Sequence, residues 1–174
     1  MKNLWFLAIA LASITGKTTL LPTFENAVKL HAESSGPEDA AKVEEAYAAF
    51  LATLPDSSHV AGGAGASERA FTLHNLALLA RSQGDAGIPA ALNYAIAAAA
   101  LLPEDVLLLH AEASLLRTAG RPLEAVTAWR AALSLEPNMP HALANLASTV
   151  WHRFFTLGLL DSRIAIRCRC RSPI

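Results

Sequence analysis

The sequence predicts an all-α protein, built as a short α-solenoid of antiparallel helix pairs. One unit of the pattern begins at Val106 and the next at Pro140, 34 residues later, and self-similarity at such a fixed period is typical of helical repeats. Gly84 and Gly120 lie where the first helix of a pair should end, a position that favours Gly. The chain is 53% hydrophobic but only 6% aromatic. Its apolar content is therefore rich in Ala and Leu, which favour helices and let their backbones approach closely.

Residues 1–20 have two interpretations. Lys2 precedes the apolar stretch 4–14, and Ala10 and Ala12 fit a small-x-small cleavage pattern, so residues 1–12 have the composition of a short secretory signal. On this interpretation the protein is secreted or enters the lumen of the secretory pathway. Otherwise the segment is a first helix or a disordered end, and the protein is cytoplasmic.

Residues 21–55 are predicted to form a degenerate helical hairpin. Apolar residues recur there at helical spacing, namely Val43, Tyr47, Phe50 and Leu54. The following segment, 56–69, contains Gly62, Gly63 and Gly65 and is interpreted as a flexible Gly-rich linker.

Residues 70–155 are predicted to contain two full repeats and a partial third. The expected helix pairs are 70–82 with 89–102, and 106–119 with 122–135. Equivalent positions of the three first helices hold Leu73, Leu109 and Leu143, and then Ala77, Ala113 and Ala147. Pro122 suits a first helical turn, and Pro103 and Pro137 follow helix ends.

The pattern stops half-way through the third pair, as it would at a truncated or alternative end. The first helix of the third pair, near 141–154, then lacks a covering helix, and we expect the chain to self-associate through it.

Residues 156–174 form a basic tail that we expect to be disordered. Its charged and sulfur-containing residues are Arg163, Arg167, Cys168, Arg169, Cys170 and Arg171.

The repeat pattern resembles the tetratricopeptide repeat (TPR) family. The residues that show this are Leu109, Ala113, Leu116, Gly120, Ala125, Trp129, Ala132 and Pro137. Segment 137–147 is similar to repeats of the O-linked N-acetylglucosamine transferase superhelix. The resemblance implies that the first helices line a concave groove, where Asn at repeat position 6 holds an extended peptide. That position is Asn75, Ala111 and Asn145 in successive units, so the expected peptide-binding residues are Asn75 and Asn145.

The predicted function is that of a protein–protein interaction module whose concave face binds an extended peptide or a partner protein. An Asn amide offers an acceptor and two donors, which can pair with one peptide unit whatever its side chain. The alternative is a substrate-recruiting TPR segment of a larger enzyme, such as a glycosyltransferase or hydroxylase.

No residues are predicted to be catalytic, and neither a metal nor a cofactor is expected. His74, His110 and His141 lie one per repeat, about 10 Å apart if their helices pack normally, whereas zinc ligands lie about 2 Å from one metal. Thr15-Gly16-Lys17-Thr18 resembles the end of a phosphate-binding loop, but the required earlier Gly is Leu11. The chain is therefore not expected to be an enzyme.

Charge and hydropathy restrict the partners further. The net charge is −1, which gives no reason to expect a nucleic-acid partner. The mean hydropathy is +0.33, yet no apolar run approaches the roughly 20 residues of a transmembrane helix. Two cysteines, close together in the tail, exclude a disulfide framework.

Overall fold

The computed structural model describes residues 21–34 and 37–156, and every regular element in them is helical. In this part of the chain, seven α-helices follow one another, with two short 3-10 helices between them. In order, they are α2 (Leu21–Glu33), α3 (Pro37–Ala52), η1 (Asp56–His59), α4 (Ala66–Ser82), η2 (Asp85–Gly87), α5 (Ile88–Leu101), α6 (Val106–Thr118), α7 (Pro122–Leu135) and α8 (Pro140–Thr156). The expected signal segment 1–20 and tail residues 157–174 lie outside the described part.

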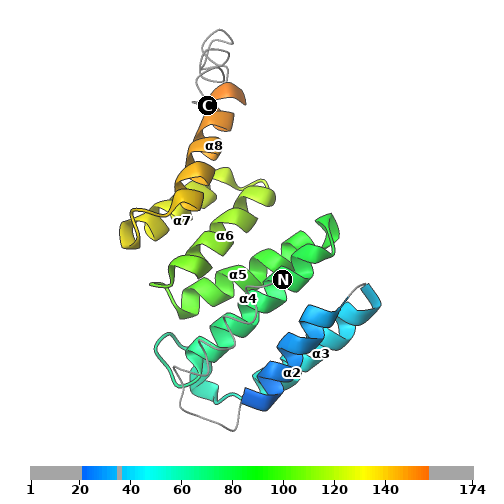
Figure 1. Cartoon of the computed structure of the whole chain (residues 1–174). Helices are drawn as coiled ribbons and strands as arrows, with labels where there is room; N and C mark the ends of the chain where they lie inside the picture. The colour runs from blue at the N-terminus through cyan, green and yellow to red at the C-terminus, as the bar shows by residue number, and fades with distance from the viewer. Residues whose placement is uncertain (1–20, 35–36, 157–174) are drawn as a thin grey trace.

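The helices pack as antiparallel pairs in series (Figure 1), which confirms the predicted fold class. The closest pairs are α4 with α5 and α6 with α7, followed by α2 with α3. Successive pairs are joined by packing of α5 on α6 and of α7 on α8. No helix among the described residues is both long and apolar enough to cross a membrane.

Turn chemistry sets the ends of the central helices. Gly84 and Gly120 follow the ends of α4 and α6 with φ of +76° and +75°, a conformation that favours Gly. The carboxylate of Asp105 accepts hydrogen bonds from the backbone N–H groups of Leu107 and Leu108, at 2.9 and 3.0 Å. Asp105 therefore caps α6 and satisfies two of its free donors.

Small residues line the crossings between helices, as the repeat pattern requires. Ala77 and Ala91 belong, with Ala113 and Ala125, to one buried cluster that spans α4 to α8. Trp129 fills the middle of this cluster and is fully buried. Ala at these crossings allows the first and second helices of each full pair to approach closely.

The segment 56–69 differs from the flexible linker that its glycines suggested. Its first residues form η1, and α4 already begins at Ala66. The Arg69 side chain connects this segment to the hairpin, because its Nε donates to Ser58 Oγ at 2.7 Å and its Nη2 donates to the Leu51 carbonyl at 3.4 Å. A Cβ on Gly63 would lie 1.9 Å from the Ser57 carbonyl oxygen. Here Gly permits a tight backbone approach, and the segment is compact.

Candidate functional site

The packing of the pairs leaves one stripe open on α6 and on α8, and α4 has an equivalent stripe that is open only in part. Residues at offsets 0, 3, 4, 7, 10 and 11 share one side of a helix, and we call the combined stripes of α4, α6 and α8 the first-helix face. Its members are Phe71, His74, Asn75, Leu78, Arg81 and Ser82; Leu107, His110, Ala111, Ser114, Arg117 and Thr118; and His141, Ala144, Asn145, Ser148, Trp151 and His152.

Helix α6 shows most clearly how the open stripe differs from the buried side of the same helix. On α6 the other side is buried, through Leu108, Leu109, Ala113, Leu115 and Leu116. All six members of the stripe on α6 are at least partly exposed. Because α7 and α5 cover the buried side, the stripe faces away from the core.

The two predicted Asn residues lie in different surroundings. Asn145 on α8 is partly exposed and belongs to the open part of the face. Asn75 on α4 is fully buried. The structure thus departs from the open groove expected around Asn75, because α2 and α3 cover that part of α4.

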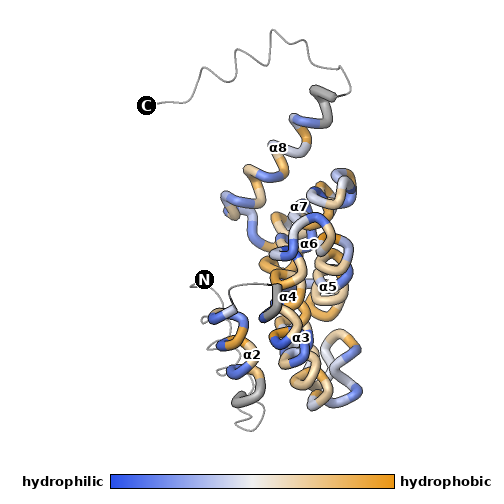
Figure 2. Tube along the Cα trace, turned by 90° about the vertical axis from the view of Figure 1, so that its right-hand side faces the viewer, coloured by the Kyte–Doolittle hydropathy of each residue, from blue (hydrophilic) through white to orange (hydrophobic). Residues whose placement is uncertain are grey.

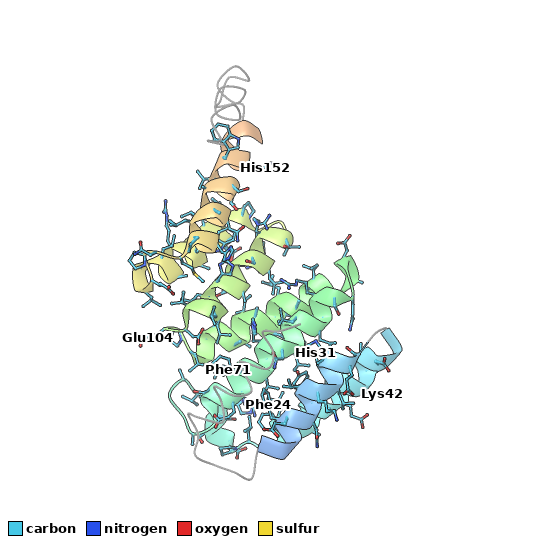
Figure 3. All side chains as sticks on the ribbon, in the orientation of Figure 1. Phe24, His31, Lys42, Phe71, Glu104 and His152 are labelled. Atoms are coloured by element: carbon cyan, nitrogen blue, oxygen red, sulfur yellow. The ribbon has the colours of Figure 1, made fainter. Side chains whose placement is uncertain are left out.

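The contacts around Asn75 explain its burial. Leu76 and Leu79 of α4 share a core cluster with Phe24, Val43 and Tyr47 of the α2–α3 pair, and Phe71 packs against the same cluster (Figure 3). The Tyr47 hydroxyl lies near the Asn75 amide, yet neither amide atom has hydrogen-bonding geometry to any described group. The hydroxyl instead lies 3.1 Å from His31 Nδ1, and burial raises the pKa of Tyr47.

Two histidines of the face, His74 and His110, have lowered pKa values. Burial lowers the pKa of His74, an effect that the nearby Asp105 carboxylate opposes and Arg81 reinforces. Burial also lowers the pKa of His110, and the neighbouring His141 lowers it further. The influence of His141 on His110 places the stripes of α6 and α8 next to each other.

The arrangement offers polar and apolar groups that can bind a ligand. Within residues 21–34 and 37–156, no group of three or more His, Cys, Asp or Glu side chains could hold a metal ion. The face combines amide, imidazole and hydroxyl groups with the apolar side chains of Leu107 and Trp151. Such a mixture can bind a polar backbone and its apolar side chains together.

Helix α8 has a second open side, which no other described helix covers. Leu143 is 47% exposed, whereas the equivalent Leu109 of α6 is 9% exposed. Ala147 is exposed, whereas the equivalent Ala113 is fully buried. Both views show α8 extending beyond α6 and α7 (Figures 1 and 2), and His152 lies on this projecting end (Figure 3).

Most residues of the first-helix face, including Arg81 and Arg117, were not predicted from the sequence to bind a ligand, and the histidines, although seen to recur once per repeat, were not assigned to a peptide-binding face. The sequence nevertheless contains a signal for these residues, which is the repeat period. Once the repeat start is known, each member of the face follows from its offset along the first helix. The cover over Asn75 had no comparable signal, because it depends on how a hairpin outside the clear repeats packs.

Comparisons with known proteins support the fold. No family model matches the chain, and no curated protein matches it in sequence. One similar solved structure is the Yersinia enterocolitica type III secretion chaperone SycD in complex with a peptide of the translocator YopD. It matches with a TM-score of 0.60 and 13% sequence identity, and the match covers 79% of this chain and 96% of that chain. At this identity the likeness shows the helical solenoid fold; it does not show a specific similarity to the O-linked N-acetylglucosamine transferase repeats.

Proposed function

We propose that this protein is an interaction module that binds an extended peptide, or an extended segment of a partner protein, along the concave side formed by its first-helix face. The observation that supports this most is the open stripe on α6, whose six members all remain at least partly exposed while the rest of the helix is well packed. The similar chaperone structure, which contains a peptide of its translocator, supports the same class of function.

The chemistry of the face suits a peptide. An extended backbone presents unpaired N–H and C=O groups, which need donors and acceptors when they leave water. Ser114, Asn145 and Ser148 offer both kinds of group from α6 and α8. Leu107 and Trp151 are exposed apolar side chains at the two ends of this region and offer contacts for apolar side chains of the ligand.

We assign backbone binding to Asn145 first. Its amide lies on the open part of the face, where a ligand can reach it. Asn75 takes part only if the α2–α3 pair moves away from α4, because that pair now covers it. In this proposal the module binds without chemistry of its own, and none of the comparisons supports the glycosyltransferase alternative.

The proposal is tested by blocking the face. Peptides that bind the full chain are selected from a displayed random library, synthesised, and titrated against two variants. Ala111→Trp places a large ring in the middle of the open stripe on α6. Ala131→Trp makes the same change on the exposed surface of α7 and is the control.

We expect Ala111→Trp to weaken binding by about tenfold or more, since bound side chains and the new ring compete for one space. Ala131→Trp should bind as the unchanged protein does. Circular dichroism of both variants checks that the helices remain. Equal affinities of the two variants, or a library without binders, would contradict the proposal.

We infer as well that the open side of α8 joins two copies of the chain. Leu143 and Ala147 occupy positions that are buried in the complete repeats, so their exposure leaves apolar surface in water. A second copy offers an identical apolar surface, and pairing the two would bury both.

A further inference from the structure

The charges of the molecule are unevenly distributed over its surface. The whole chain is nearly neutral, with 14 Lys and Arg against 15 Asp and Glu. The first-helix face has a different composition, because its members include two arginines and four histidines but no Asp or Glu. Apart from the Asp105 carboxylate, which lies near His74, the side chains that a peptide would contact along this face are therefore basic or neutral.

The carboxylates of the same helices have other positions and other partners. Asp105 lies at the start of α6 and caps its backbone N–H groups. Glu112 lies next to the stripe. Burial raises the pKa of Glu112 most, and the nearby charges that also affect this pKa are Arg121 and Glu124 at the start of α7. The charges that act on Glu112 are therefore those at the start of α7, and neither Arg81 nor Arg117 is among them.

The two arginines are available to a ligand. Arg81 and Arg117 occupy equivalent positions near the ends of α4 and α6, and both are exposed. Neither forms a salt bridge with a described residue, whereas Arg121 pairs with Glu124 at 2.6 Å. A guanidinium without a carboxylate partner can bind a ligand carboxylate through two parallel hydrogen bonds.

We propose that the first-helix face selects acidic peptide segments that also contain apolar residues, with ligand carboxylates at Arg81 and Arg117 and along the histidines. This inference rests on the proposed function and names the class of its ligand. The apolar residues of the segment contact Leu107 and Trp151. The acidic residues supply the charge that the face itself lacks.

The histidines make this selection dependent on pH. The charged groups that act on His74 are the Asp105 carboxylate and the Arg81 guanidinium. His141 of α8 acts on His110. In the free protein, burial keeps the pKa values of His74 and His110 below 6.5, with smaller contributions from Arg81 and His141, and Asp105 only partly offsets this effect on His74. A bound carboxylate raises both values, so binding takes up protons. The affinity for an acidic peptide therefore increases as the pH falls below 6.5.

The test uses three labelled synthetic peptides with one Leu- and Pro-containing framework, whose remaining positions are all Asp, all Ser or all Lys. Each is titrated against the full chain at low salt by fluorescence anisotropy. We expect the Asp peptide to bind about tenfold more tightly than the Ser peptide, and the Lys peptide to bind most weakly. Between pH 7.5 and 5.5, where Asp stays ionised with a pKa of about 3.9, its affinity should increase.

Charge variants identify the surface. Arg81→Ser with Arg117→Ser should remove most of the preference for the Asp peptide, and each single change should remove part of it. Arg130→Ser, which removes one charge from the exposed side of α7 as each single change does from the face, should preserve the preference. His110→Gln should reduce the increase in affinity at low pH. Equal binding of the three peptides, with Ala111→Trp still inhibitory, overturns the inference and leaves the proposed function standing. Absence of binding by all three, or a preference unaffected by the arginine changes, also overturns the inference.

Discussion

Leu109 and Leu143 hold the same position in successive repeats, yet Leu109 is 9% exposed and Leu143 is 47% exposed. The difference arises because α7 covers α6, while no described helix covers the equivalent side of α8. The tube in Figure 2 shows apolar residues continuing along this projecting helix. The two leucines therefore show that, within the described residues, α8 exposes apolar surface that is buried in the preceding repeat.

The first prediction concerns self-association through this surface. Leu143→Asp should shift the chain toward monomer in sedimentation velocity experiments, because a charge at the contact resists removal from water. Leu135→Asp is the matched control, since Leu135 is also 47% exposed but lies at the end of α7. If both variants associate as the unchanged chain does, or if the unchanged chain is monomeric, α8 is not the contact.

The second prediction concerns the buried amide of Asn75. Both of its polar side-chain atoms are buried without a partner, and an unsatisfied buried polar group costs about 1–3 kcal/mol. Asn75→Leu should therefore increase the free energy of unfolding by about 1 kcal/mol or more. Asn145→Leu, made on the partly exposed equivalent residue, should change it little. A lower stability of Asn75→Leu in chemical denaturation would show that the amide has a partner, with the Tyr47 hydroxyl the nearest candidate.

The third prediction concerns stability and pH. Burial lowers the folded-state pKa values of His31, His74 and His110 below 6.5. The unfolded chain therefore binds more protons in this range, so the free energy of unfolding should decrease as the pH falls below 6.5. His74→Gln should make that decrease smaller, whereas His59→Gln, at an exposed position in η1, should not. A pH dependence unchanged by His74→Gln would contradict the assignment to this residue.

The fourth prediction concerns backbone binding by position 6 of the repeats. For a selected peptide, Asn145→Ala should weaken binding by about 0.5–1.5 kcal/mol, the usual value of one hydrogen-bonding side chain. Ala111→Asn should strengthen it, because a second amide then lies beside Asn145 on neighbouring stripes. Isothermal titration measures both effects. Unchanged affinities would show that position 6 of this protein is only a solvated helix position.

The central helices could be predicted from the sequence because their information is local. Gly120, Pro122 and Pro137 mark helix ends through backbone geometry, and the observed α6 and α7 end within one residue of the predicted bounds. Buried Ala positions such as Ala113 followed from the repeat register. These features depend on neighbouring residues and on one period.

Features that depend on distant packing could not be predicted in the same way. The three glycines of the segment 56–69 suggested flexibility, but Arg69 connects that segment to the α2–α3 pair, and α4 begins earlier than expected. The same hairpin covers Asn75. Neither effect has a periodic signal, because the hairpin lies outside the clear repeats.

The most direct test of peptide binding along the first-helix face is a two-dimensional amide NMR titration of the full chain with a peptide selected for binding. We predict that chemical shifts change for residues of the open stripes, including Ser114 on α6 and Ala144 and Ser148 on α8. Thr127 and Ala131, on the exposed side of α7, should remain unchanged. Shift changes restricted to α5 and α7, with the stripes of α6 and α8 unaffected, would contradict the account.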